Sequence, residues 1–239
     1  EDFIHWSSWE YVEIVGEVPW PNHLYTNSGH PYYRAPYYLM FPKRFLPERK
    51  FDPDWPHDGL SDVILLAGRD GLRFYRPCPE PFLRPGLDPA NWHERAIFIA
   101  PHAVRTAEGE MSLYSVQNYR TSDIHIRRLT LREDGFVSVH ASSEGGSLLT
   151  RPLVYDGDLL EINYATSAAG GLKVGLVDGL DREVAGFSTE DCEEIYGDEI
   201  SRIVTWAAGQ RVSASAGRPV RLRFQMHEAD LFSFRFVRS

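Results

Sequence analysis

Short stretches that alternate apolar with polar residues fill the first half of the chain. They are rich in β-branched and aromatic side chains, which favour strands over helices. Five strands are predicted here, within RAPYYLMFPKRF (34–45), VILLAGR (63–69), AIFIAPHAV (96–104), MSLYSVQNY (111–119) and IRRLTLR (126–132). The polar, proline-interrupted segment PERKFDPDWPHDG (47–59) is expected to be a long surface loop, a kind of segment that often carries function.

After Gly145-Gly146 the alternation becomes more regular, and proline and tryptophan become rarer. Five further strands are predicted within LLEINYATS (159–167), GLKVGLVDG (171–179), ISRIVTW (200–206), PVRLRFQM (219–226) and LFSFRFV (231–237). Turns such as AAGG, DGLDRE and SAGRP separate them, a series typical of an antiparallel β-sandwich. In the last strand Phe232, Phe234 and Phe236 share one face, which is expected to be core.

A six-residue phrase recurs along the chain as EDFIHW (1–6), RDGLRF (69–74) and, more weakly, EDGFVS (133–138). An acidic turn ahead of alternating apolar positions indicates a strand-turn-strand unit, and its return at a near-constant spacing is typical of propeller blades. Because Asp2, Asp70 and Asp134 occur in every copy, they suit a structural turn better than a single active site. The predicted fold is all-β, with the last blades of a β-propeller over residues 1–144 and an antiparallel β-sandwich over residues 145–239.

The predicted propeller is incomplete, because closure needs at least four or five blades and this chain supplies about two. We therefore expect the chain to be the C-terminal part of a larger protein. An incomplete propeller would expose a strand edge and an apolar blade face. We expect it to pair with further polypeptide, such as upstream blades, or to self-associate.

The charge and hydropathy of the chain limit its partners. A net charge of -9 over 239 residues argues against a nucleic-acid partner, which needs clustered cations to neutralise phosphates. No 18-residue apolar run is present, so no membrane partner is expected. The prediction is a soluble protein, located either in the bacterial cytoplasm or outside the cell.

Metal and thiol chemistry find little support in the sequence. Cys78 and Cys192 form neither a disulfide scaffold nor a zinc motif. Asp178, Asp181 and Glu183 in VDGLDRE are the nearest metal-like cluster and leave a structural calcium open, although a hairpin turn is the simpler explanation. No other cofactor is predicted.

Several phrases together resemble a bacterial glycoside-hydrolase-like family related to family 32 and family 43 enzymes. They are HLYTN (23–27), YYRAP (32–36), GLDPANWHERA (86–96), LEINYATSAAGGLKVGLVDG (160–179), GDEISRIVTW (197–206) and PVRLRFQMHEADLFSFRF (219–236). Members combine a five-bladed propeller with a β-sandwich, and this chain matches their C-terminal portion. The resemblance implies carbohydrate chemistry.

Relatives of that kind place three acidic residues around the propeller axis, of which two perform acid/base chemistry on the glycosidic bond. Their Arg-Asp-Pro triplet corresponds here to Arg34-Ala35-Pro36, so the acid is absent at this position. Glu94 is the first candidate for a catalytic carboxylate, because it precedes a predicted inner strand; a structural salt bridge is the alternative. Asp62 is the second candidate, with a strand-entry residue as its alternative.

Candidate sugar-binding residues surround these carboxylates in the sequence. Sugars are bound by aromatic faces beside hydrogen-bonding groups, a mixture that the first half of the chain offers. The candidates are Arg34, Arg95, His93, His23, Tyr25, Asn27 and Trp20. The alternatives are that Arg34 pairs with a neighbouring blade and that the aromatic residues fill blade interfaces.

Two functions of different classes remain from the sequence. The first is part of a glycoside hydrolase that cleaves a plant or microbial glycan. The second is a non-catalytic protein of the same fold that binds glycans or assembles with partners.

Overall fold

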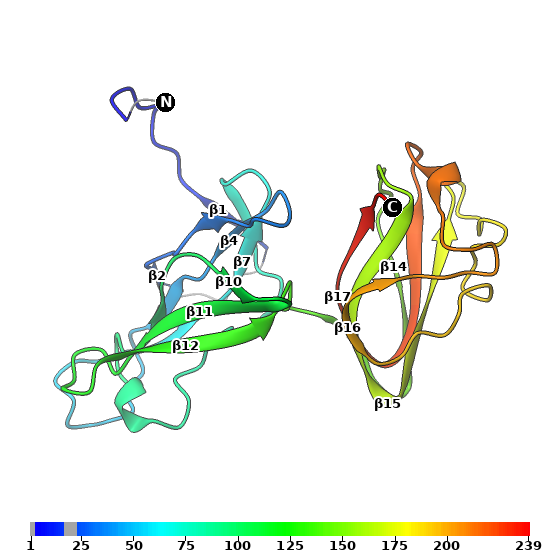
Figure 1. The fold of residues 1–239 in the computed structure, drawn as a ribbon. Coiled ribbons are helices and arrows are strands. Elements are labelled where there is room, and N and C mark those ends of the chain that lie inside the picture. Colours follow the sequence, from blue (N-terminus) through cyan, green and yellow to red (C-terminus); the bar gives the residue numbers. More distant parts are fainter. Residues whose placement is uncertain (1–2, 17–22) are drawn as a thin grey trace. The chain divides into compact units, whose positions relative to one another are not determined.

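The computed structural model describes residues 3–16 and 23–239, which form two compact units, Glu1–Leu131 and Arg132–Ser239 (Figure 1). The all-β prediction is confirmed. In the described ranges the helical elements are two 3-10 turns, η1 (Pro89–Asn91) and η2 (Ser213–Ser215). No helix among these residues has the length and apolarity needed to cross a membrane.

The first unit contains three small sheets. One has the order β1-β8-β7-β4-β3 and is mixed, because β1 and β8 run parallel while its other pairs are antiparallel. Its strands are β1 (Glu13–Val15), β3 (His30–Pro31), β4 (Tyr38–Met40), β7 (Leu66–Gly68) and β8 (Arg73–Tyr75). The side chains of Ile64, Leu66 and Phe74 are fully buried beneath it.

The other two sheets of this unit are antiparallel. The first has the order β2-β5-β6, from β2 (His23–Tyr25), β5 (Lys43–Leu46) and β6 (Leu60–Val63). The second has the order β10-β11-β12, with β9 also paired to β11, from β9 (Phe98–Ile99), β10 (Val104–Ala107), β11 (Glu110–Gln117) and β12 (His125–Arg132).

Two of the predicted strands are divided in the structure. Residues 34–45 supply β4 to one sheet and β5 to another, with Phe41 and Pro42 between them. Residues 96–104 are likewise divided between β9 and β10, where His102 adopts a φ of 74° that extended backbone does not have. Alternation of residue types predicted both extended runs but not the bends inside them.

The recurring aspartate at position 70 forms the turn between β7 and β8. Its carboxylate accepts hydrogen bonds from the backbone N–H groups of Leu72 (2.9 Å) and Arg73 (2.7 Å), and Gly71 follows with a φ of 77°. Asp2, the first copy, lies outside the described residues. At Asp70 the contacts are those of a structural turn.

The second unit is built on one curled sheet around two long strands (Figure 1). The order is β13-β17-β15-β16, with β14 also paired to β17. The strands are β13 (Val139–Ala141), β14 (Gly146–Leu149), β15 (Leu159–Val177), β16 (Asp198–Ile203) and β17 (Arg221–Val237). Its core includes the fully buried Tyr164 and Phe224, and the Trp206 indole donates to the Val174 carbonyl at 2.7 Å.

The predicted turn AAGG is part of a strand. Four predicted strands form two long ones, because β15 continues through Gly170 and Gly171 while β17 passes His227 and Glu228. A Cβ at Gly170 would lie 2.3 Å from the Glu228 carbonyl oxygen. The glycines therefore allow the two strands to pair closely where their register is irregular. In the sequence alone, the same glycines indicate a turn.

The predicted aromatic core face of the last strand is interrupted at Phe232. The β15–β17 register shifts from Asn163↔Ser233 to Tyr164↔Leu231, which leaves Phe232 as an extra residue in β17. Leu231 is consequently buried, while the Phe232 ring lies 4.3 Å from the Arg132 guanidinium. Phe234 and Phe236 pack against the core as predicted. A bulge of this kind reverses the alternation on one side of it.

The compact units divide after Leu131, whereas the sequence texture changes at residues 144–145, and the predicted domain boundary there stays a prediction. Arg132 belongs to the second unit through its side chain. Its guanidinium pairs with Asp198 at 2.6 Å and donates to the Tyr164 and Glu199 carbonyls, both at 3.1 Å.

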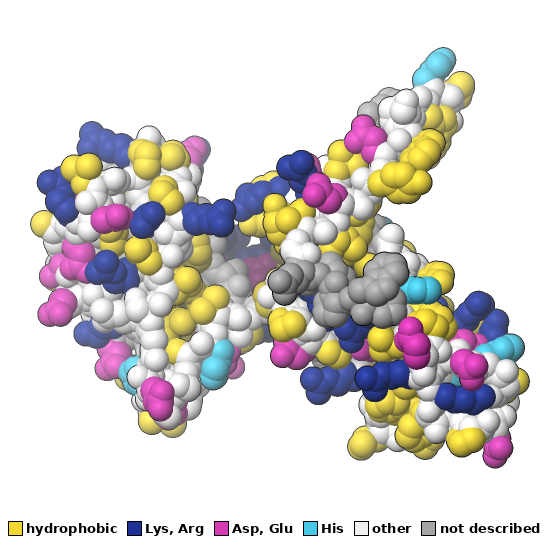
Figure 2. All heavy atoms as spheres, turned by 180° about the vertical axis from the view of Figure 1, so that it is seen from behind, with side chains coloured by type: hydrophobic (Ala, Val, Ile, Leu, Met, Phe, Trp, Pro, Cys, Tyr) yellow, Lys and Arg dark blue, Asp and Glu magenta, His cyan; other side chains and the backbone are white. Residues whose placement is uncertain are grey.

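An extended segment at the start of the described chain carries exposed aromatic side chains. Figure 2 shows hydrophobic side chains gathered along this arm, which projects from the first unit. Phe3, Trp6, Trp9 and Tyr11 are each at least 74 % exposed. They contact one another in two edge-to-face pairs, Phe3 with Trp6 and Trp9 with Tyr11.

Candidate functional site

A cavity of about 800 Å³ opens in the first unit, within the size range of small-molecule sites. It is lined by Tyr25, Thr26, Lys43, Phe45, Pro56, His57, Asp58, Glu94, Arg95, Phe98, Tyr119 and Arg120. Strands β2, β5 and β9 supply part of the wall, and the loop between β5 and β6 supplies another part. That loop is the proline-interrupted segment 47–59 predicted from the sequence.

Gly59 ends this loop and lies against the Phe45 ring, which lines the cavity. Its φ is +107°, and its N–H donates to the Arg49 carbonyl at 2.7 Å. A Cβ at this position would lie 2.1 Å from Cε2 of Phe45, which lines the cavity. Both the backbone conformation and the contact with the ring therefore require glycine.

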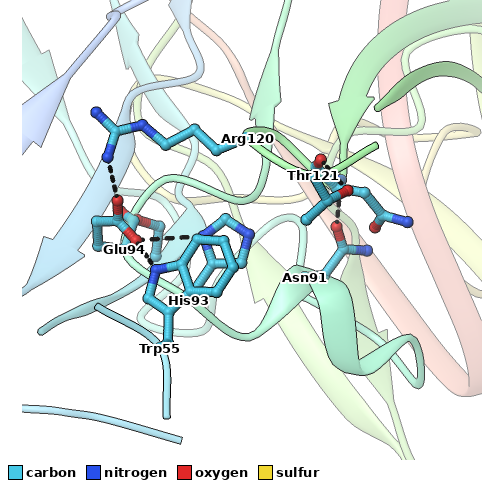
Figure 3. Close-up of polar contacts among 8 residues, drawn as sticks. Trp55, Asn91, His93, Glu94, Arg120 and Thr121 are labelled. Carbon is cyan, nitrogen blue, oxygen red and sulfur yellow. Dashed lines mark hydrogen bonds and ion pairs between the residues drawn. The ribbon is translucent and has the colours of Figure 1, made fainter. Parts of the chain in front are cut away.

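Glu94 is the most tightly held carboxylate on the wall (Figure 3). Its side chain is nearly fully buried, at about 5 % exposure. One oxygen accepts a hydrogen bond from the Trp55 indole and the other from the Arg120 guanidinium, each at 2.7 Å. His93 Nδ1 lies 3.3 Å from the oxygen that Trp55 contacts. These partners come from three separate segments and fix the carboxylate in one orientation.

The surroundings of Glu94 keep it ionised. Burial, the largest single influence, raises the pKa of Glu94, because a low-dielectric environment disfavours the charge. The hydrogen bond from Trp55, the positive charge of Arg120 and the other contacts of the carboxylate together outweigh burial, so the pKa lies below its ordinary value. Glu94 is therefore a carboxylate near neutral pH, and a weaker base than an ordinary glutamate.

His93 contacts the Glu94 carboxylate but is not part of the cavity lining. Its ring stacks on Trp55 with centroids 4.2 Å apart and an interplanar angle of 21°. Burial lowers the pKa of His93, so the ring is neutral near pH 7. A neutral ring beside a carboxylate donates from Nδ1, which places the proton on that nitrogen.

A buried polar network holds the segment that carries His93 and Glu94. Asn91, labelled in Figure 3, lies at the centre of this network. It donates to the Gln117 side chain at 2.8 Å and accepts from the Asn118 backbone N–H at 2.9 Å. Asn118 in turn donates to Asp88 at 3.0 Å. Asn118 and Arg120 both have positive φ, 53° and 69°, a conformation uncommon for residues with a side chain. The network thus fixes the unusual backbone from which Arg120 reaches Glu94.

Lys43 is a buried cation on the same wall. It is 7 % exposed, and its ammonium lies 5.5 Å from the centroid of the Phe98 ring. Burial is the main reason that its pKa is lowered; Arg95 and Arg120 lower it further, while the charge of Glu94 raises it. No ion pair or hydrogen bond of the Lys43 ammonium is found with any residue that the structure describes.

The structure brings part of the predicted site together. Glu94, Arg95 and Tyr25 line the cavity, and His93 contacts Glu94. The His23 ring lies beside those of Tyr25 and Phe45, at centroid distances of 6.5 and 6.1 Å.

Other predicted residues lie elsewhere. Asp62 receives two hydrogen bonds from Arg44, its cross-strand partner, at 2.9 and 2.5 Å. Arg34 is in the turn between β3 and β4, and Asn27 accepts from the Phe41 N–H through its backbone carbonyl. None of these three lines the cavity. Trp20 lies outside the described residues.

The sequence analysis missed Trp55, Lys43, Arg120 and Asp58. A signal existed for Lys43, since residues two apart on a strand share a face and Lys43 lies between the apolar Phe41 and Phe45. Trp55 and Asp58 belong to a loop that was singled out only as a whole. Arg120 contacts Glu94 across the fold, a pairing that no local pattern records.

The acidic turn in the second unit has arginine partners. Asp178 pairs with Arg182 at 2.9 Å, Asp181 with Arg221 at 3.1 Å, and Glu183 with Arg223 at 2.8 Å. Within residues 3–16 and 23–239, no group of three or more His, Cys, Asp or Glu side chains has a geometry that could hold a metal ion. Here the hairpin-turn interpretation accounts for all three carboxylates.

Comparison with protein-family models gives no match, and no curated protein and no solved structure matches the chain significantly.

Proposed function

We propose that this chain is a carbohydrate-active protein, part of a glycoside hydrolase that cleaves a plant or microbial glycan, and that the cavity beside Glu94 holds the sugar. The observation that carries the proposal is a buried, ionised carboxylate on the wall of a cavity that also contains aromatic rings. Tyr25, Phe45, Phe98 and Tyr119 offer the faces on which the C–H groups of a sugar pack.

The proposed chemistry assigns Glu94 the role of nucleophile or base. Its carboxylate would attack the anomeric carbon or take a proton from the attacking water. The leaving oxygen needs a proton from a second group, because Glu94 is already ionised. Asp58 of the cavity lining pairs with Lys50, and Asp62 is held by Arg44, so we propose that this acid comes from upstream blades.

The proposed fold follows the family resemblance. The small sheets of the first unit are interpreted as the last blades of a five-bladed propeller, and the curled sheet of the second unit as the β-sandwich. The turn at Asp70, which joins two antiparallel strands at a recurring phrase, supports the interpretation as blades. Upstream blades would supply further acids.

A non-catalytic glycan-binding protein is the second candidate, and one observation favours it. Both oxygens of Glu94 already accept hydrogen bonds, from Trp55 and Arg120. A carboxylate held in this way can organise a binding site without taking part in a reaction.

Glycan binding and glycan hydrolysis, measured on the same panel of oligosaccharides, test the proposal and separate the two candidates. Glu94→Gln is expected to abolish hydrolysis, by at least about a thousandfold, because it removes the reacting charge while keeping the shape. Glu110→Gln is the matched control, since Glu110 pairs with Arg128 on the surface and does not line the cavity.

The outcomes are distinct. Hydrolysis lost in Glu94→Gln and retained in the control supports the enzyme. Binding without hydrolysis in the unmodified protein supports the glycan-binding candidate. If the folded protein neither binds nor cleaves any glycan of the panel, the proposal is wrong. Circular dichroism and thermal unfolding of each variant establish that it is folded.

A further inference from the structure

We propose that the cavity selects glycans that carry an anionic group, a carboxylate or a sulfate, and that Lys43 and Arg95 contact this group. The inference rests on the proposed function and adds the chemical class of the sugar.

The first argument is the balance of charge on the wall. Three cations, Lys43, Arg95 and Arg120, face two carboxylates, Glu94 and Asp58. Arg120 pairs with Glu94 at 2.7 Å, and Asp58 pairs at 3.2 Å with Lys50, which is not part of the wall. Lys43 and Arg95 therefore have no carboxylate partner among the described residues, in a chain whose net charge is -9.

The second argument is the cost of the Lys43 position. The Lys43 side chain is 7 % exposed and its ammonium reaches water only at the cavity, so part of its hydration is lost without a directly bonded anion to replace it. The Phe98 ring compensates only partly through its π face. An anion brought by a ligand would supply the missing contact, and the binding free energy would include relief of this cost.

The third argument is the position of Lys43 opposite an aromatic ring. In the β2–β5 pair Lys43 is the register partner of Tyr25, and directly opposed residues project to the same face. Tyr25 is 49 % exposed and also lines the cavity. A sugar ring on Tyr25 thus places a substituent at Lys43.

The fourth argument is that the Glu94 carboxylate, on the same wall, does not strongly repel an anionic ligand. Glu94 is neutralised by Arg120 and engaged by Trp55, so its charge is already compensated. Lys43 and Arg95 together are sufficient to bind one anionic substituent on a sugar. Two cations are too few to neutralise a polyphosphate backbone.

Calorimetric titration of the full chain with matched oligosaccharides tests this inference. The probes are an oligogalacturonide and its fully methyl-esterified form, which share a backbone and differ in charge, and a sulfated galactan oligosaccharide beside its desulfated form. The acidic member of a pair is expected to bind about tenfold more tightly than its neutral counterpart. Comparison of the two pairs distinguishes carboxylate from sulfate.

Variants assign the effect to the two cations. Lys43→Met removes the charge at similar length and is expected to abolish the preference, while Lys43→Arg restores part of it. Arg95→Gln changes an exposed side chain, so it provides a test that does not depend on refolding of the core. Lys173→Met, in the second unit, removes the same charge at a residue that does not line this cavity and should keep the preference.

Two results overturn the inference. Equal binding of acidic and neutral members leaves the proposed function in place and shows that charge is not selected. A preference that survives both Lys43→Met and Arg95→Gln places the anion elsewhere. If no member of either pair binds and the wider glycan panel is also negative, the proposed function itself has failed.

Discussion

At the scale of single residues, the site depends on how charged side chains that are shielded from water are compensated. Glu94 and Lys43 are both almost fully buried on one wall, yet their surroundings differ. Hydrogen bonds and a guanidinium compensate the carboxylate, while an aromatic ring is the main contact of the ammonium. The pKa values of both groups are lowered, which stabilises the charge of Glu94 and destabilises that of Lys43.

The lowered pKa of Glu94 predicts how stability depends on pH. The unfolded chain takes up this proton near the ordinary value of 4.5, whereas the folded chain takes it up at a lower pH. The stability that Glu94 contributes is therefore complete above pH 4.5 and is lost as the pH falls through the folded-state pKa.

Urea unfolding at about pH 7 and about pH 3.5 measures this contribution, with Glu94→Gln for comparison because glutamine does not titrate. The stability advantage of the unmodified protein over the variant is expected to shrink on acidification. An advantage of equal size at both pH values would show that the Glu94 pKa is not lowered in the folded state.

The sequence indicated some site residues and not others for a physical reason. Glu94, Arg95 and His93 are adjacent in the chain and precede an apolar run, so a local pattern was sufficient. Arg120 and Trp55 meet Glu94 from distant segments, and their roles exist only once the chain has folded. The burial of Lys43 could have been inferred from strand alternation, but its lack of a counter-charge could not.

At the scale of elements, alternation predicted strand content better than strand extent. Both long strands of the second unit were predicted as pairs of shorter ones, because glycines that permit close pairing resemble turn residues. The shift in register at Phe232 was likewise invisible, since a bulge depends on the partner strand as well as on the strand itself.

The loop between β5 and β6 yields a prediction about its last residue. Gly59→Ala is expected to lower the free energy of unfolding by about 1–3 kcal/mol, because the new Cβ would overlap the Phe45 ring and φ is positive. Urea unfolding measures the loss, and a weaker affinity for the oligosaccharide probes should accompany it because Phe45 lines the cavity.

Gly16→Ala is the matched control for this change. Its φ of +104° is close to that of Gly59, but a Cβ there has no atom of a described residue within 4 Å. The control therefore carries the backbone penalty alone, about 1 kcal/mol. Equal losses in the two variants would mean that the Phe45 ring moves aside without cost.

At the scale of the whole molecule, exposed apolar surface indicates association. The aromatic arm at residues 3–11 leaves Phe3, Trp6, Trp9 and Tyr11 largely exposed, a concentration that is unusual for a surface without a partner.

Light scattering coupled to size-exclusion chromatography, over a range of concentrations, checks this prediction. The mass is expected to exceed 27.3 kDa and to rise with concentration. The double variant Trp6→Ser and Trp9→Ser should shift the mass toward the monomer, whereas Leu180→Ser, an exposed apolar residue of the second unit, should not. A monodisperse monomer at every concentration would contradict the prediction.

The central place of β17 in its sheet also determines when the second unit can form. This strand pairs with β13, β14 and β15, although it follows all three of them in the chain. Until Arg221–Val237 has left the ribosome, three strands lack the partner that their hydrogen bonds require. The second unit must therefore fold after translation of nearly all of its residues, through contacts between segments distant in sequence, which is the slow regime of β-sheet folding.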